Sequence, residues 1–95
     1  MFSFDFHNVK IEKAKDSSQL VVKGEVTNCS GKSYSTIAVR IILFVKSTTI
    51  SNTIFVINGL TNGATKSFEK SIDELDYDAI GKDITHHEIY TESCF

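Results

Sequence analysis

Hydrophobic and polar residues alternate along most of the chain, and helical spacing is nearly absent. In the segment 20–28, one face would carry Leu20, Val22, Gly24, Val26 and Asn28. Lys23, Glu25 and Thr27 fall between them, so the segment predicts a half-buried β-strand with one solvated side. Because Gly24 has no side chain, its position in mid-strand indicates either close approach by another segment of the chain or a bulky neighbour that packs over it.

The segment 35–46, STIAVRIILFVK, is apolar on both faces near its end. Its first face carries Ile37, Val39, Ile41, Leu43 and Val45. Its second face carries Ala38, Arg40, Ile42 and Phe44. A strand that is covered on both faces is usually central in its sheet, so we expect this strand to lie between two others.

The first segment of the chain changes its apolar face part-way along. It begins with the alternating residues Phe2, Phe4 and Phe6. Val9 and Ile11 follow on the other face, which predicts a β-bulge around His7 and Asn8 because a bulge inserts one extra residue.

Three further strands are predicted at 53–57, 66–72 and 84–90, and the acidic segment 73–81 is predicted to be a loop with one helical turn. Short strands separated by turns every 8–12 residues or so are typical of two packed antiparallel sheets. The pattern therefore predicts an all-β sandwich of about six or seven strands.

The 95 residues are enough for one domain, 1–95, with one core. No signal peptide is visible, which fits either a cytoplasmic protein or a domain excised from a longer protein. Because predicted strands run close to both ends, we expect the second. The net charge is −2 and no basic residues cluster densely, which argues against a nucleic-acid partner. No apolar run approaches the roughly 18 residues of a membrane span, so this segment is not expected to insert directly.

Three stretches resemble the FxLYD-type domains of bacterial and archaeal envelope proteins: GEVTNCSGKS, VRIILFV and INGLTNGATKSFEKSI. The positions that match are Gly24, Val26, Asn28, Leu60, Gly63 and Phe68. The namesake motif keeps only Leu43 and an aromatic residue, and Asn62 stands where the family has proline. The resemblance implies an immunoglobulin-like β-sandwich that serves as an accessory module of an extracytoplasmic or membrane-anchored protein.

The segment after the second predicted strand has the composition of a tight turn. Asn28 is expected to bond to the backbone two residues on, and Gly31 to supply a positive φ. Asn28-Cys29-Ser30 also fits the N-glycosylation sequence pattern. Cys29 and Cys94 permit one disulfide, which would need an oxidising compartment; otherwise both are free thiols.

The second face of the segment 35–46 is the main candidate for function. If the other sheet leaves Arg40, Ile42 and Phe44 uncovered, they form part of an exposed apolar patch, the mark of an interaction surface. Open sheet edges could also recruit a strand from a partner, or they could join copies of the chain if it is a stand-alone structural subunit. We therefore expect a non-enzymatic module that binds a protein partner, with no cofactor.

A metal-binding protein is the alternative, built on His86, His87 and Glu88. Alternate residues of a strand share a face, so His86 and Glu88 could bind an ion together, with His7 as a third ligand. The acidic cluster of the segment 73–81 lacks the glycine and the final glutamate of an EF-hand and is expected to be solvated. The sequence contains neither a G-x-S-x-G nor a C-x-x-C motif, so no organised catalytic set is predicted.

Overall fold

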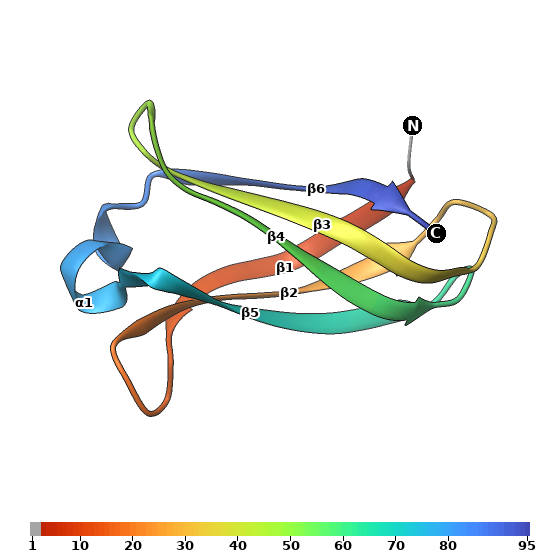
Figure 1. Ribbon diagram of the computed structural model, residues 1–95, viewed down its shortest axis with the longest axis horizontal. Helices are drawn as coiled ribbons and strands as arrows, with labels where there is room; N and C mark the ends of the chain where they lie inside the picture. Colours follow the sequence, from red (N-terminus) through yellow and green to blue (C-terminus); the bar gives the residue numbers. More distant parts are fainter. Residues whose placement is uncertain (1–2) are drawn as a thin grey trace.

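The computed structural model describes residues 3–95, which form two antiparallel sheets packed face to face (Figure 1). One sheet has the order β1-β2-β5, from strands β1 (Phe4–Lys13), β2 (Gln19–Asn28) and β5 (Thr65–Asp76). The other has the order β4-β3-β6, from β4 (Thr48–Leu60), β3 (Tyr34–Val45) and β6 (His86–Cys94). The six strands confirm the predicted β-sandwich, and β3 lies centrally, as its two apolar faces predicted.

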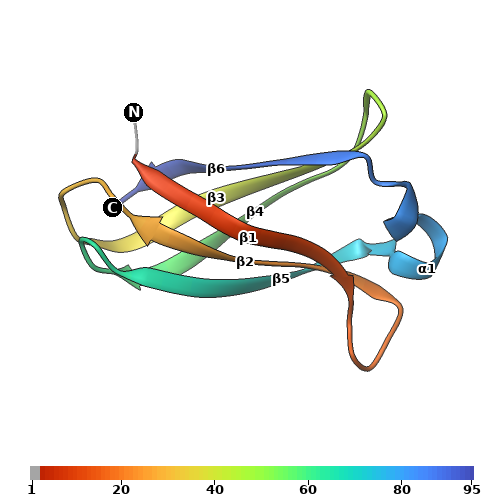
Figure 2. The ribbon, with the colours of Figure 1, turned by 180° about the vertical axis from the view of Figure 1, so that it is seen from behind.

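The core lies between the sheets and is built from the inward positions of the alternating strands. β2 and β3 supply most of it, because both are paired on two sides and bury one full face. The buried cluster consists of Leu20, Val22, Val26, Ile37, Val39, Ile41, Leu43, Ile57, Leu60, Phe68 and Ile72. Figure 2 shows the same two layers from behind, with the β1-β2-β5 sheet in front.

Gly24 faces this core beneath the ring of Phe68. A Cβ atom at Gly24 would lie 2.8 Å from Phe68 Cζ and 3.1 Å from Val9 Cγ2. The prediction of a bulky neighbour over Gly24 is therefore confirmed. The Phe68 ring also meets Phe6 edge-on and Phe55 at a tilt, with centroids 6.2 and 5.6 Å apart.

The predicted bulge in β1 is also present. The register against β2 shifts between His7 and Lys10, and Asn8 has a φ of 54°. Asn8 Nδ2 donates a 2.6 Å hydrogen bond to Glu25 Oε1, which stabilises the bulge. The shift allows Val9 and Ile11 to pack against the same core as Phe6.

The predicted boundaries need correction in three strands. β4 begins at Thr48 rather than at 53, because its polar first residues pair with the end of β3 in a hairpin. β6 spans His86–Cys94 rather than 84–90. β5 continues to Asp76, so the predicted loop begins only there.

The acidic end of β5 remains a strand because its side chains find partners on other strands. Gln19 Nε2 donates to Asp73 Oδ1 over 2.6 Å, and Ser51 Oγ donates to Glu74 Oε1 over 2.8 Å. The predicted helical turn follows as α1 (Tyr77–Ile80) and a 3₁₀ turn over Gly81–Asp83. No helix in the described part of the chain is long and apolar enough to cross a membrane.

Asn28 is fully buried and joins two turns at one end of the sandwich. Its Oδ1 accepts from the Ser30 N–H, two residues on, which confirms the predicted turn. Its Nδ2 donates to the carbonyls of Lys32 and Leu60, over 2.7 and 3.0 Å. The folded domain therefore offers no free Asn28 amide for glycosylation. Gly31 has a φ of 87°, as predicted.

Candidate protein-interaction face

The solvent-facing side of the β4-β3-β6 sheet, here called the outer face, carries the three residues predicted for interaction. Arg40, Ile42 and Phe44 alternate along β3 with fully buried core residues. Their side chains therefore point away from the β1-β2-β5 sheet, which covers only the inner face. All three are half-buried by their neighbours on β4 and β6.

The neighbouring strands add exposed hydrophobic side chains to this face. On β4, Val56 lies beside Ala38 and Ile54 beside Arg40, and they are 58% and 48% exposed. On β6, Tyr90 lies on the other side of Arg40 and is 42% exposed. We call the set the outer apolar patch: Ala38, Ile42, Phe44, Ile54, Val56 and Tyr90.

Arg40 is held flat across the patch by partners on both neighbouring strands. Its Nε and Nη2 donate to the two carboxylate oxygens of Glu92 over 2.6 and 3.0 Å. Its Nη1 donates to Asn52 Oδ1 on β4. Hydrogen bonding to Glu92 raises the pKa of Arg40, and the same bonds lower the pKa of Glu92. A two-point guanidinium–carboxylate pair fixes the side-chain geometry, so the centre of the patch is ordered in advance of any partner.

His86 and Phe44 close the other end of the patch. Their rings stack with centroids 4.3 Å apart and an interplanar angle of 8°. Glu88 follows on the same face of β6, opposite Ile42, whereas His87 points to the other side. His86 and Glu88 thus share a face, as predicted.

The third metal ligand considered, His7, lies on β1 in the other sheet, 3.3 Å from Asp5 and 3.8 Å from Glu25. Within residues 3–95, no three histidine, cysteine or acidic side chains are grouped so that they could hold a metal ion. Metal binding by His86 and Glu88 stays a prediction, with no third ligand assigned.

No bond joins Cys29 and Cys94 in the structure; the first is exposed and the second is half-buried. Cys94 packs against the core beside Tyr34. Hydrogen bonding with Cys94, together with burial, raises the pKa of the Tyr34 hydroxyl. A disulfide between the two cysteines stays a prediction.

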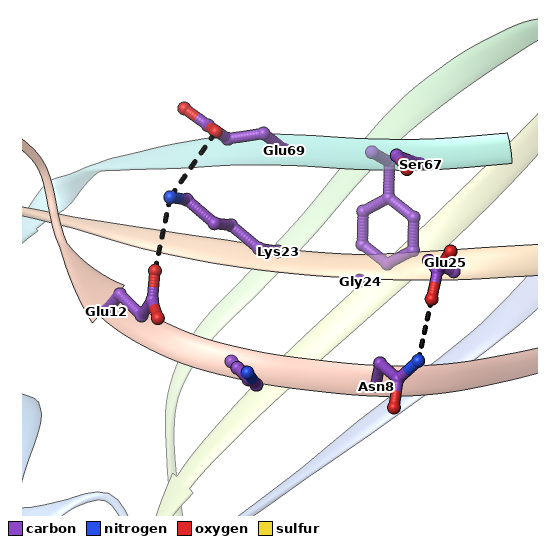
Figure 3. Close-up of a pocket in the computed structure, with 9 residues that line it drawn as sticks. Asn8, Glu12, Lys23, Gly24, Glu25, Ser67 and Glu69 are labelled. Atoms are coloured by element: carbon purple, nitrogen blue, oxygen red, sulfur yellow. Dashed lines mark hydrogen bonds and ion pairs between the residues drawn. The ribbon is translucent and has the colours of Figure 1, made fainter.

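A shallow depression lies on the solvent side of the other sheet, over Gly24, and it was not predicted from the sequence (Figure 3). Lys23 Nζ lies between Glu12, at 3.1 Å, and Glu69, at 3.8 Å. The hydrogen bond with Glu12 is the main reason why the pKa of Lys23 is raised. The lining holds two lysines, Lys10 and Lys23, and three glutamates, so the depression offers only a small negative charge to a ligand.

Sequence reasoning found the β3 part of the outer face but missed its flanks. Ile54, Val56, Tyr90 and Glu92 join the patch through strand register, which the alternation within one strand does not give. The only local signal was the run of exposed β-branched residues in β4.

No protein-family model matches the sequence, and no curated protein matches it. One solved structure has a similar fold: β-glucosidase 3B from Thermotoga neapolitana, in complex with α-D-glucose. The alignment has a TM-score of 0.53 and 11% identity, and it covers 99% of this chain but 17% of the glucosidase. A likeness at this identity concerns the fold alone.

Proposed function

We propose that this domain is a non-enzymatic interaction module that binds a protein partner through the outer apolar patch. The observation that carries the proposal is the clustering of Ile54, Val56 and Tyr90, exposed on one sheet face around the fixed Arg40–Glu92 pair. Exposed apolar side chains with an ordered arginine among them are typical of binding surfaces, in which aromatic residues and arginine supply much of the energy. The patch is open and lacks a deep pocket, which suits a protein surface better than a small molecule.

The proposal includes an immunoglobulin-like architecture and an FxLYD-type origin. The strand orders β1-β2-β5 and β4-β3-β6 correspond to the immunoglobulin orders A-B-E and C′-C-F. The resemblance to FxLYD-type domains implies an accessory module, so we propose that this one belongs to a longer extracytoplasmic or membrane-anchored protein. An oxidising location would also allow the bridge between Cys29 and Cys94.

A binding experiment with matched variants tests the proposed face. The wild-type domain, Val56→Lys and Ser67→Lys would be immobilised and incubated with extract of the cells that produce the protein. Both substitutions add one positive charge at an exposed position, but Ser67 lies on the other sheet. We expect a partner to bind wild type and Ser67→Lys equally and to be lost with Val56→Lys, as measured by quantitative mass spectrometry.

Equal retention of every bound protein by the two variants would contradict the proposal. Thermal unfolding of each variant serves as the control for folding. Both substitutions should leave the free energy of unfolding within about 0.5 kcal/mol of wild type, since they lie on the surface.

A further inference from the structure

β6 lies at the margin of its sheet, and among the described strands only β3 pairs with it (Figure 1). The carbonyls of Thr36 and Phe44 accept from the N–H groups of Phe95 and Thr85, so the even-numbered residues of β3 face β6. The backbone groups of an antiparallel strand alternate between its two sides. Glu88, opposite Ile42, therefore bonds to β3, whereas His87 and Ile89 direct their N–H and C=O groups to the open edge.

Two of the other edge strands, β1 and β5, carry features that discourage pairing, and β6 largely lacks them. β1 has a bulge and the lysines at 10 and 13, and β5 has lysines at 66 and 70. Lys66 Nζ also donates to the Asn58 carbonyl of β4. β6 contains neither lysine nor proline, and its register shift lies near its end, opposite Ala38 and Val39. Its stretch 86–91 is thus a regular open edge.

We propose that β6 pairs antiparallel with β6 of a second copy of this chain, about a two-fold axis at Ile89. The two three-stranded sheets then form one continuous sheet of six strands. The second β6 occupies the place that strand G takes beside strand F in an immunoglobulin domain.

Charge and hydrogen bonding select this register. With the axis at Ile89, Glu88 faces the Tyr90 hydroxyl of the second copy. His86 comes opposite Glu92, which lies in the register shift just past the regular stretch. An axis at Tyr90 would place Glu88 opposite Glu92 twice, and an axis at Glu88 would oppose two copies of Glu88. Like charges directly opposite one another are unfavourable, so of these three registers only the one at Ile89 gives complementary pairs. An axis at His87 would also pair His86 with Glu88, but it would place Thr91 opposite Asp83, which lies outside β6.

The inner face of β6 gives an independent reason for the same register. Thr91 Oγ1 is buried and has no hydrogen-bond partner among residues 3–95. In the Ile89 register, Thr91 lies directly opposite His87 of the second copy, whose ring nitrogens can supply the missing bond. Ile89 meets its own symmetry mate, which extends the apolar core across the junction. The pairing therefore satisfies a group that the single chain leaves unsatisfied.

The axis is perpendicular to the sheet, so the outer faces of both copies point the same way. The dimer would thus present two outer apolar patches side by side, which favours a repetitive or symmetric partner through avidity. The dimer does not depend on the proposed protein partner. The dimer would use the backbone groups at the edge of β6, whereas the partner would bind to the side chains of the outer face.

Sedimentation equilibrium tests the pairing directly. Because pairing along one short strand makes a small interface, the dimer is expected to be weak, and the concentration series should run from about 10 µM to about 1 mM. We expect the mass to rise toward twice the 10.6 kDa of one chain. A mass of one chain throughout the series would overturn the proposal.

Two matched variants identify the edge. His86 and Thr49 flank Phe44 on opposite sides, and both are exposed. His86→Glu places like charges opposite Glu92 twice per dimer and should raise the dissociation constant at least about tenfold. Thr49→Glu adds the same residue on β4 and should leave it unchanged. Dissociation with Thr49→Glu instead would overturn the proposal, because the contact would then involve β4.

Amide hydrogen exchange of the wild-type chain gives a test that needs no variant. The N–H groups of His87 and Ile89 should exchange more slowly as the concentration rises, at least about fivefold between the ends of the series. Protection of these two amides that does not change with concentration, while the mass doubles, would also overturn the proposal.

Discussion

At the residue scale, the packing of Phe68 over Gly24 joins β5 to β2 in the middle of the core. The ring occupies the space that a side chain at position 24 would need, and it also contacts Phe6 and Phe55 from both sheets. One glycine thus determines how closely the large rings can approach β2. Its backbone is extended, so the requirement is for space rather than for an unusual φ.

Gly24→Ala should therefore destabilise the domain although alanine suits a buried strand better than glycine. The new Cβ would meet Phe68 Cζ at 2.8 Å, and overpacking of this kind costs about 1–3 kcal/mol. Urea unfolding measures the loss. Gly24→Ala should cost less free energy of unfolding in a Phe68→Leu background than in wild type, because the smaller side chain leaves room for the new Cβ. Strictly additive costs in the Gly24→Ala/Phe68→Leu double mutant would contradict the steric explanation.

Asn28 has a comparable role at the end of the sandwich, through hydrogen bonds rather than packing. Asn28→Ala removes the donors to the Lys32 and Leu60 carbonyls and the acceptor for the Ser30 N–H. Buried groups left without partners cost about 1–3 kcal/mol each, so we expect a loss of at least about 2 kcal/mol. Thr27→Ala, which removes one exposed hydroxyl pair with Thr65, is the control and should cost well under half as much.

At the scale of elements, the Arg40–Glu92 pair ties β3 to β6 across the outer face. Arg40 holds the folded-state pKa of Glu92 below the usual value of 4.5. A depressed carboxyl pKa adds stability that is fully present above the unfolded pKa and is lost as the pH falls through the folded value. The contribution should therefore disappear in acid, at pH values below about 4.5.

The variant Glu92→Gln isolates this effect. Wild type should melt higher than Glu92→Gln at pH 7, and the two melting temperatures should converge as the pH is lowered past the ordinary carboxyl range. Thermal unfolding at a series of pH values measures the difference. A difference in melting temperature that stays constant down to pH 2 or so would show that Glu92 contributes through its shape alone.

The elements were predictable in proportion to how fully they are buried. β2 and β3 are paired on both sides, and their alternation fixed both their position and their core residues. β4 and β6 are edge strands whose outer positions are apolar or mixed. Their alternation is therefore weaker, and the predicted boundaries were wrong by several residues. The end of β5 was missed because Asp73 and Glu74 are bonded to Gln19 and Ser51, which are distant in sequence.

The outer face likewise has a part that was predictable from the sequence and a part that was not. The outward direction of Arg40, Ile42 and Phe44 follows from the period of a strand. Their neighbours Ile54, Val56, Tyr90 and Glu92 depend on the register of β3 against β4 and β6, which includes two shifts. Register with such shifts arises from tertiary contacts that alternation within a strand does not encode.

At the scale of the whole molecule, the two sheets should differ in stability between their centres and their margins. β2 and β3 are hydrogen-bonded on both sides and carry most of the buried residues, whereas α1 buries none. Amide hydrogen exchange should therefore be slowest in β2 and β3 and fastest in α1. Equal protection of α1 and β3 would contradict this distribution of stability.

The domain as a whole has a polar sheet with paired charges on one side and an ordered apolar patch on the other. The ion pairs of Lys23 with Glu12 and Glu69 lie on the first. Ile54, Val56 and Tyr90 remain exposed on the second, around Arg40. This asymmetry is the basis for the proposal that a protein partner binds to the β4-β3-β6 sheet.

Photo-crosslinking in the living cells that produce the protein tests this central claim most directly. A benzophenone amino acid would be placed at Val56 in the outer apolar patch or at Ser67 on the other sheet, both exposed positions. The account predicts a discrete adduct with another protein from Val56 and none from Ser67. The same adducts from both positions, or an adduct from Ser67 alone, would contradict it.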